Sequence, residues 1–299
     1  MEIRRFGQTD MKVSILGFGG AEIGFEHAEP AAVAKLLNSA LDAGLNVIDT
    51  AECYAGSEEL IGSTVSHRRG EYYLFSKCGH ASGLEGEDWS PAMLEESINR
   101  SLRRLKTDYL DLIQLHSCSK EVLERGDVIE VLRRAKEAGK VRYIGYSGEN
   151  EAALYAIETG AFDTLQTSVN LADQRGIDLI LPKAQESGMG VIAKRPIANT
   201  AWKTTTLPEE QYHQTYWRRF QELNYSFLND TSIEEAVSTA LRFTLTVPGV
   251  HTAIVGTTNP DRWTQNAKLL EAGRLPAAQM NEIRSKWKNT AREDWLGQV

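Results

Sequence analysis

The sequence has little cysteine, no long apolar run and no cluster of basic residues, and each absence excludes a class of protein. The three cysteines, Cys53, Cys78 and Cys118, are too few and too scattered for a disulfide framework, and no C-x-x-C or H-x-x-H spacing indicates zinc. No apolar stretch approaches the roughly 20 residues of a membrane helix, and none follows MEIRRFGQTD as in a signal peptide. We therefore expect a cytoplasmic protein with reduced thiols, no metal and no membrane partner.

The charge balance argues against a nucleic-acid partner. Lys and Arg total 33 against 41 Asp and Glu, a formal net charge of -8, and no basic stripe is present. Binding to a polyphosphate normally depends on clustered Lys and Arg. The chain has 299 residues, 41% of them hydrophobic, and no linker or low-complexity segment, so we expect one domain over residues 1–299. Oligomeric state stays open.

A unit of helix, tight turn and strand recurs along the chain. It is seen in LDAGLNVIDT, AKEAGKVRYIGYS, ETGAFDTLQTS and AQESGMGVIAKRP, where a helical pattern meets a glycine and then a short apolar run. The glycines, Gly44, Gly139, Gly160 and Gly188, stand just past a helix end, where a left-handed backbone favours glycine. Strict alternation of helices and strands predicts a parallel sheet.

Eight strands can be placed, which favours a closed (β/α)8 TIM barrel over an open doubly wound sheet. They are expected near residues 16–20, 46–50, 72–77, 109–116, 142–147, 163–167, 190–194 and 252–256. MEIRRFGQTDMKVSILGFG predicts a β-hairpin around Gln8, Thr9 and Asp10 that plugs the barrel floor. An extra helix is expected at the C-terminal end.

Local signals mark two helix starts and one long connection without a pattern. PAMLEESINRSLRRL predicts a helix over residues 91–105, with Ser90 as N-cap and Pro91 in the first turn. Ser232 and Glu235 have the spacing of a capping box. The connection over residues 196–231 is aromatic and polar, and we expect it to be a long active-site loop.

Polar residues stand at the ends of the predicted strands: Asp49, Lys77, His116, Ser147, Gln166 and Lys194, with Gly256 at the end of the last. In a (β/α)8 barrel the carboxyl ends of the strands meet at one face, where enzymes of this fold keep their chemistry. Taken singly, Asp49 could cap a turn, Lys77 could be solvated, His116 could be a core histidine and Tyr54 could simply pack. Their occurrence together favours a catalytic site.

This set of side chains suits proton delivery to an oxygen that becomes anionic. A free tyrosine titrates at about 10, so Tyr54 is a poor acid unless positive charge stabilises its phenolate. Lys77 can supply that charge, and Asp49 can hold Lys77 protonated and oriented. His116 can donate a hydrogen bond to a carbonyl oxygen from the other side.

Four motifs in order, DTAECYAGSE, FSKCG, LIQLHS and GKVRYIGYSG, resemble the aldo-keto reductase superfamily, NAD(P)H-dependent carbonyl reductases on a (β/α)8 barrel. The resemblance extends from RRFGQTDMKVSILGFGG to IVGTTNPDRWTQN. It implies a catalytic tetrad of Asp49, Tyr54, Lys77 and His116, the same four residues found at the strand ends. It also implies reduction of an aldehyde or ketone with Tyr54 as general acid.

The resemblance further implies a cofactor site, with NADPH favoured over NADH because Arg262 matches the residue that meets the 2′-phosphate. LGFGGAEIG fails as a G-x-G-x-x-G fingerprint, since Glu22 stands at the third glycine, but it matches the family's first barrel loop. Gly256 to Thr258 match the phosphate site and are expected to open a helix. The implied cofactor residues are Gly19, Gly20, Ala21, Asp49, Ser147, Gln166, Lys194, Arg195, Pro196, Ile197, Gly256, Thr257, Thr258, Arg262, Gln265 and Asn266.

The chain departs from the family pattern at four of these places. Gly148 stands where Asn commonly follows the serine, and Lys194 stands where an aromatic ring usually stacks on the nicotinamide. Gln265 replaces a frequent Glu beside the adenine, and Gly256 replaces a Lys of some branches. These departures bear on cofactor affinity more than on the chemistry.

The substrate is expected to be a small carbonyl compound, either an apolar or aromatic aldehyde or a sugar aldehyde. Aromatic residues in the loops after the first, third and seventh strands are candidate pocket walls: Phe25, Trp89, Trp202, Tyr216 and Trp217. Cys53, Cys78 and Cys118 lie close to the tetrad in sequence, so oxidation of one could modulate activity.

Two rival functions stay open. One is a regulatory or sensor subunit that binds NADPH with little turnover, as potassium-channel partners in the family do. The other is an unrelated barrel enzyme, such as a Schiff-base aldolase with Lys77 or Lys194 as nucleophile.

Overall fold

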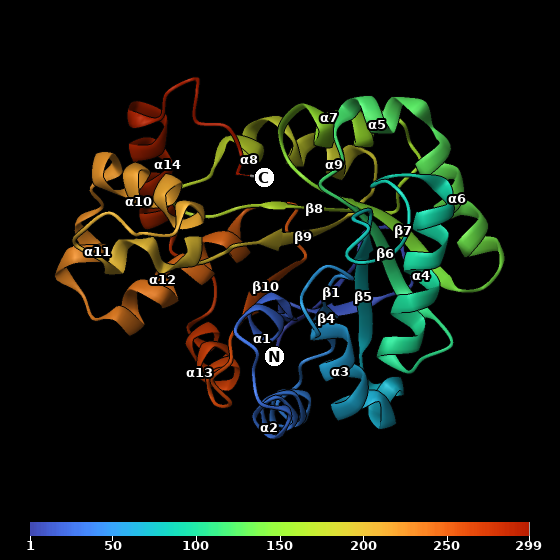
Figure 1. Ribbon diagram of the computed structural model, residues 1–299. Helices are drawn as coiled ribbons and strands as arrows, with labels where there is room; N and C mark the ends of the chain where they lie inside the picture. Colours follow the sequence, from blue (N-terminus) through green and yellow to red (C-terminus); the bar gives the residue numbers. More distant parts are fainter. Residues whose placement is uncertain (299) are drawn as a thin grey trace.

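A computed structural model of the chain describes residues 1–298 and shows eight parallel strands closed into a barrel with helices around it (Figure 1). Around the barrel, the strands follow the order β10 (Thr252–Gly256), β3 (Leu16–Gly19), β4 (Val47–Asp49), β5 (Tyr73–Cys78), β6 (Leu110–His116), β7 (Val141–Ser147), β8 (Thr164–Ser168) and β9 (Gly190–Lys194). The predicted (β/α)8 barrel is confirmed, and each predicted strand agrees to within one residue at either end.

Helices connect the strands and cover the outside of the barrel (Figure 1). They are α1 (Ala21–Phe25), α2 (Pro30–Asp42), α3 (Ser57–Val65), η1 (Ser66–Glu71), α4 (Pro91–Leu105), α5 (Lys120–Arg125), α6 (Asp127–Glu137), α7 (Asn150–Glu158), α8 (Arg175–Leu179), α9 (Leu181–Glu186), η2 (Ala198–Lys203), α10 (Gln211–Leu223), α11 (Ser226–Asp230), α12 (Ile233–Thr246), α13 (Arg262–Leu269), η3 (Leu270–Ala272) and α14 (Ala277–Thr290). The glycines of the recurrent unit have positive φ, as predicted: Gly44, Gly139, Gly160 and Gly188. Ser90 stands at the N-cap position of α4, as predicted, but makes no side-chain hydrogen bond to the helix, and Ser232 forms the predicted capping box with Glu235.

The N-terminal hairpin closes the amino end of the barrel. Strand β1 (Ile3–Arg5) pairs antiparallel with β2 (Lys12–Ser14). Three buried side chains of the hairpin, Phe6, Met11 and Val13, pack against side chains of the barrel strands. These barrel residues are Val47, Phe75, Leu112 and Ile192. This apolar floor confirms the predicted plug and leaves the opposite end for polar groups.

The connection over residues 196–231 is largely helical, so the expectation of a long loop is wrong. It contains η2, α10 and α11. The helix α10 forms because Tyr216, Phe220 and Leu223 recur at helical spacing and are all buried.

The C-terminal end returns to the barrel mouth after the predicted extra helix, α14 (Figure 1). Arg219 donates to the Leu296 carbonyl at 2.5 Å, and the Gly297 N–H donates to Asn150 Oδ1 at 2.7 Å. The last described residues are therefore fixed to α10 and to the start of α7. Among the helices of residues 1–298, none has the length and apolarity that a bilayer crossing requires.

Candidate active site

The predicted tetrad comes together at the carboxyl end of the barrel. Asp49 is the last residue of β4, Lys77 lies near the end of β5, and His116 ends β6. Tyr54 follows β4 in a short loop before α3. Because β4, β5 and β6 are neighbours, three separate parts of the chain bring these side chains to one place.

A buried ion pair forms the base of the site. Lys77 Nζ donates to Asp49 Oδ1 at 2.5 Å and to the Thr50 carbonyl at 2.8 Å, and Gln114 Nε2 donates to Asp49 Oδ2 at 3.2 Å. The two charged side chains are only 2% and 1% exposed. Burial has the largest single effect and lowers the pKa of Lys77, but the Asp49 carboxylate together with Tyr54 and Cys53 outweighs it, so the pKa is raised. Lys77 therefore keeps its charge.

Tyr54 lies against that charge. Lys77 Nζ is 4.9 Å from the centre of the Tyr54 ring. Burial raises the pKa of Tyr54 to about 12, and Lys77 partly offsets this. Tyr54 thus stays protonated at neutral pH, and Lys77 is placed to stabilise the phenolate when the proton leaves.

His116 faces Tyr54 edge-on, with 5.5 Å between the ring centres. Burial, followed by the charges of Lys77 and Lys194, holds the pKa of His116 well below its usual range, so the imidazole is neutral. Cys53 Sγ lies 3.4 Å from His116 Nδ1, and burial raises the pKa of the Cys53 thiol to about 12. The thiol therefore keeps its proton and can donate it to Nδ1, which leaves the imidazole proton on Nε2.

Ser147 and Gln166 offer unpartnered polar atoms beside the tetrad. Ser147 ends β7, and its Cα partner in β8 is Gln166. Ser147 Oγ and both Oε1 and Nε2 of Gln166 are buried without a hydrogen-bond partner in the described chain. Buried polar groups are normally paired, and an unpaired one costs about 1–3 kcal/mol. A carboxamide, which has one acceptor and two N–H donors, fits these residues.

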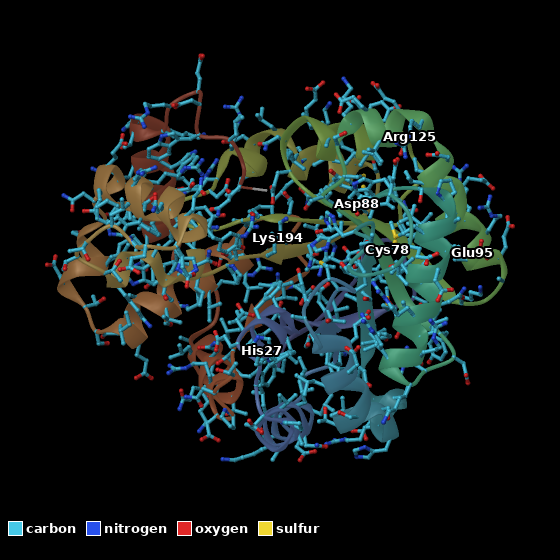
Figure 2. The ribbon with its side chains drawn as sticks, in the orientation of Figure 1. His27, Cys78, Asp88, Glu95, Arg125 and Lys194 are labelled. Atoms are coloured by element: carbon cyan, nitrogen blue, oxygen red, sulfur yellow. The ribbon has the colours of Figure 1, made fainter. Side chains whose placement is uncertain are left out.

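Lys194 ends β9 and pairs with Glu149, a residue not singled out from the sequence. Its Nζ is 3.2 Å from Glu149 Oε1, and the carboxylate also accepts from Thr167 Oγ1 at 2.6 Å and from Ser168 N and Oγ at 2.8 Å. Burial lowers the pKa of Lys194 to about 8, although Glu149 opposes the shift. Figure 2 labels Lys194 near the middle of the molecule. A fully bonded carboxylate therefore fixes the lysine that replaces the expected aromatic ring.

The residues after β9 are tied to the C-terminal end. Arg195 has a φ of +55° and donates to Ser168 Oγ at 3.0 Å and to the Gln298 carbonyl. Pro196 is buried, and Ile197 precedes η2. This side of the barrel mouth is thus closed by contacts within the chain.

The predicted phosphate site, Gly256 to Thr258, does not open a helix directly, which corrects that expectation. The helix α13 begins at Arg262. A turn intervenes because two side chains bind its backbone: the Asn259 N–H donates to Thr257 Oγ1 at 3.1 Å, and the Asp261 N–H donates to Asn259 Oδ1 at 3.0 Å.

Two carboxyl groups face this segment. Gly256 is paired with Gly19 across β10 and β3, and a Cβ atom on Gly256 would collide with the Glu22 carboxyl. Thr258 Oγ1 donates to Glu26 Oε2 at 2.9 Å. Burial raises the pKa of Glu22. A phosphate bound here would meet the Glu22 side chain.

The remaining predicted cofactor residues lie in α1 and α13. Gly20 immediately precedes Ala21, the first residue of α1. A Cβ atom on Gly20 would lie 2.7 Å from a serine hydroxyl of α3, so the two segments are closely packed at this turn. The helix α13 exposes Arg262 and Gln265 and buries Asn266.

A sequence profile of the aldo/keto reductase family matches residues 15–288. The chain belongs to this family. Its relatives include the uncharacterized oxidoreductase YqkF of Bacillus subtilis, 28% identical over 305 residues that cover 96% of this chain and 97% of YqkF. The L-galactose dehydrogenase of Arabidopsis thaliana is 32% identical over 214 residues, 66% of either chain. The holo form of the aldo-keto reductase AKR11C1 from Bacillus halodurans superimposes with a TM-score of 0.84 over 99% of both chains, at 28% identity.

This aldo-keto reductase is therefore an NAD(P)H-dependent oxidoreductase, and its family supports carbonyl reduction as the reaction. One departure from the family pattern has a steric reason. A Cβ atom on Gly148 would lie within 2.6 Å of Tyr146 ring carbons. The Tyr146 hydroxyl is held by a 2.7 Å bond to the Cys118 carbonyl, so the ring cannot move aside freely and residue 148 has to be small.

Two of the five aromatic candidates for the pocket wall lie beside the tetrad of the reductase. The Phe25 ring centre is 5.5 Å from that of Tyr54. Trp89 is 5.2 Å from His80, which is 5.5 Å from His116. Phe25 therefore contacts the tetrad directly, whereas Trp89 reaches it through His80.

The other three candidates pack around α10. Trp202 contacts Phe220 at 5.3 Å between ring centres, and Trp217 Nε1 donates to a loop carbonyl at 3.0 Å. Tyr216 is fully buried and donates to Asp173 at 3.1 Å. No surface of Tyr216 is exposed, because its helical position turns it inward, and this does not support its place in the pocket wall.

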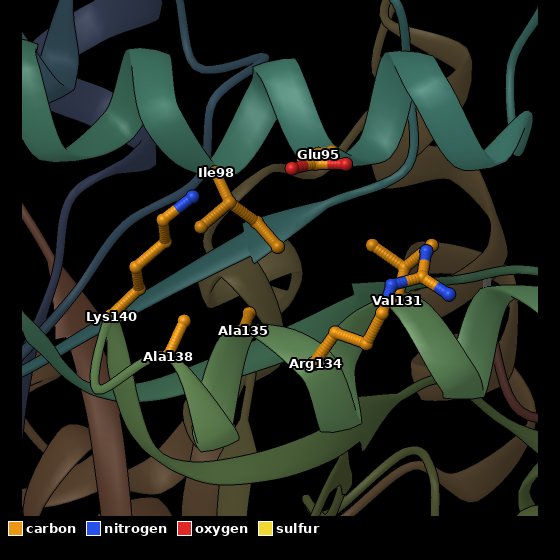
Figure 3. Close-up of a pocket in the computed structure, with 7 residues that line it drawn as sticks. All are labelled: Glu95, Ile98, Val131, Arg134, Ala135, Ala138 and Lys140. Carbon is orange, nitrogen blue, oxygen red and sulfur yellow. The ribbon is translucent and has the colours of Figure 1, made fainter.

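A cavity of about 160 Å³ lies on the outside of the barrel, between α4 and α6 (Figure 3). Its lining residues come from these helices and the turn after α6: Glu95, Ile98, Val131, Arg134, Ala135, Ala138 and Lys140. It is formed by helices and contains none of the strand-end residues, so it plays no part in the site.

The cysteines differ in access. Cys78 and Cys118 are 0% and 1% exposed, and burial raises the pKa of both thiols. They lack the exposure and the lowered pKa that reactivity requires. Cys53 is half-buried and lies against His116, but burial raises the pKa of its thiol as well, so it meets the exposure condition of the oxidation hypothesis and not the pKa condition.

Proposed function

We propose that this reductase uses NADPH to reduce an aldehyde or ketone to an alcohol, with Tyr54 as general acid. The observation that carries the proposal is the buried Asp49–Lys77 pair beneath Tyr54, with neutral His116 across from it. When bound, the cofactor supplies the hydride.

Proton transfer follows from the charges of the site. The substrate oxygen becomes more basic than the Tyr54 phenolate as the carbonyl is reduced, so the proton moves from Tyr54 to that oxygen. Lys77 stabilises the phenolate that remains, and Asp49 keeps Lys77 charged. With the protonated Cys53 thiol as donor to Nδ1, His116 carries its proton on Nε2 and donates from there to the substrate oxygen. In the oxidative direction Tyr54 is the base.

The cofactor residues are assigned by the same reasoning. Ser147 and Gln166 would hold the nicotinamide carboxamide with the polar atoms that lack partners within residues 1–298. Lys194, fixed by Glu149, would stand beside the ring where an aromatic residue is usual. Exposed Arg262, at the start of α13, would meet the 2′-phosphate and favour NADPH over NADH.

The test is a fluorescence titration with NADPH and NADH, followed by cofactor consumption against a panel of aldehydes and ketones. We expect tighter binding of NADPH and turnover that falls at least about a thousandfold in Tyr54→Phe without loss of NADPH binding. Turnover retained in Tyr54→Phe would refute the acid role. Binding without turnover on any substrate would instead favour the regulatory subunit.

A further inference from the structure

Three chemically different donor atoms meet beside the tetrad. They belong to the Glu52 carboxyl, the Cys53 thiol and the His116 imidazole, and they all lie within 4.8 Å of one another. Glu52 and Cys53 follow β4, whereas His116 ends β6, 63 residues further on. No sequence spacing shows this cluster, because the closure of the barrel creates it.

Glu52 has an unexplained oxygen. The residue is 3% exposed, its Oε1 accepts from the His80 N–H at 3.0 Å, and its Oε2 has no hydrogen-bond partner in residues 1–298. The nearby cation, Lys77, is already bound to Asp49. A buried carboxyl with a free oxygen is destabilising unless a cation or donor pairs with it.

The distances suit a tetrahedral ion. A zinc ion bound to one sulfur and one nitrogen holds them roughly 3.6 Å apart, and Cys53 Sγ is 3.4 Å from His116 Nδ1. The Glu52 oxygen needs a shift of at most about 1.4 Å to reach similar distances. A set of one sulfur, one nitrogen and one oxygen favours zinc over magnesium or calcium, which take oxygen ligands.

We propose that Glu52, Cys53 and His116 bind a zinc-like divalent cation reversibly, with a fourth coordination position open toward the barrel mouth. The metal–sulfur bond forms as the S–H bond breaks, and the thiol proton passes to solvent. Cys53 and His116 are half-buried, so an ion can reach them from the mouth.

The test titrates Co²⁺ into the cofactor-free protein and follows thiolate-to-cobalt absorption in the near ultraviolet. We expect a saturable band at one ion per chain, its loss in Cys53→Ser, and binding weakened at least about tenfold in Glu52→Gln. Cys118→Ser is the matched control, because that thiol is buried and is not one of the three donor groups, and it should keep the band. No band in the wild type, or a band that survives Cys53→Ser, overturns the site.

Two further measurements keep the outcome clear. Zn²⁺ titration calorimetry in two buffers of different ionisation heat should report release of at least one proton per ion, and zero release would contradict thiolate binding even if no variant folds. Excess chelator should remove the cobalt band, and a band that persists in excess chelator would contradict reversible binding. Because the cobalt band needs no turnover, it separates failure of the metal site from failure of the proposed reductase activity.

Discussion

The Glu22 carboxyl lies where the proposed cofactor phosphates would bind, and its removal gives a quantitative test of that site. It covers Gly256 so closely that a Cβ atom there would collide with it. Burial raises the pKa of Glu22, so its ionisation is opposed in the free protein. Glu22→Gln keeps the shape of the side chain and removes the charge.

The expected magnitude follows from Coulomb's law. A carboxylate and a phosphate charge about 5 Å apart repel by roughly 3 kcal/mol at an effective dielectric constant of 20. Solvent at the barrel mouth, salt and the fraction of Glu22 that is protonated reduce this to about 1–2 kcal/mol. Glu22→Gln should therefore bind NADPH about 5- to 30-fold more tightly at pH 8.

The pH dependence of NADPH binding tests independently whether the Glu22 charge weakens binding. As pH rises, Glu22 ionises and repels the phosphates, so the dissociation constant of the wild type should rise relative to that of Glu22→Gln. Fluorescence titrations at pH 6 and pH 8 measure the dissociation constants of the wild type and of Glu22→Gln. Exposed Glu26 is the matched control, and Glu26→Gln should change affinity less because its charge is screened by solvent. Equal affinities of wild type and Glu22→Gln at pH 8, or weaker binding by the variant, would refute the reasoning.

Three further changes test the buried groups and the barrel floor. Asp49→Asn leaves Lys77 buried without its counter-charge and should lower the free energy of unfolding by about 3–5 kcal/mol in urea; a loss below about 1 kcal/mol would show that the pair is dispensable. Burial raises the pKa of Glu52 to about 8, so the folded state binds a proton that the unfolded state has released. Wild-type stability should fall relative to Glu52→Gln as pH rises from about 4.5 to 8, and parallel profiles would contradict this. Gly7→Ala combines a φ of +56° with a collision against the backbone of residues 188–190, where β9 begins, and should cost about 2–4 kcal/mol. Gly126→Ala, with a φ of +77° and no atom within 4 Å, should cost only about 1 kcal/mol, and equal losses would exclude the collision as the cause.

The barrel was predictable because its signals are local. A glycine with positive φ follows the helix before four of the strands, β4, β7, β8 and β9, and each of these strands is a short apolar run that begins just after that glycine. The convergence of Asp49, Lys77 and His116 then follows from the rule that strand ends share one face. The helix α10 was missed although its buried residues recur at helical spacing, because aromatic and polar residues obscure the pattern.

Other contacts of the site depend on which connecting segments come together in the folded barrel. The sequence contains no signal for these contacts. Glu149 and Lys194 are 45 positions apart in the numbering but form one ion pair. In the sequence, Glu22 stands out only because it occupies the third glycine position of a G-x-G-x-x-G motif. Its contact with Gly256 exists because β10 and β3 pair to close the barrel. The chemistry of each residue predicts which bonds and reactions its side chain can take part in. The closure of the barrel determines which side chains come into contact.

The pattern of satisfied and unsatisfied polar atoms separates support from function at the barrel mouth. The Glu149 carboxylate accepts from Thr167 and Ser168 and pairs with Lys194, so its environment is complete without a ligand. Ser147 and Gln166, in contrast, hold three buried polar atoms without a partner in residues 1–298. Each unpaired atom costs about 1–3 kcal/mol, so these groups destabilise the folded protein when no ligand is bound. A bound carboxamide would offset that cost, and this is why we expect NADPH to raise the unfolding temperature of the wild type by more than it raises that of Gln166→Leu.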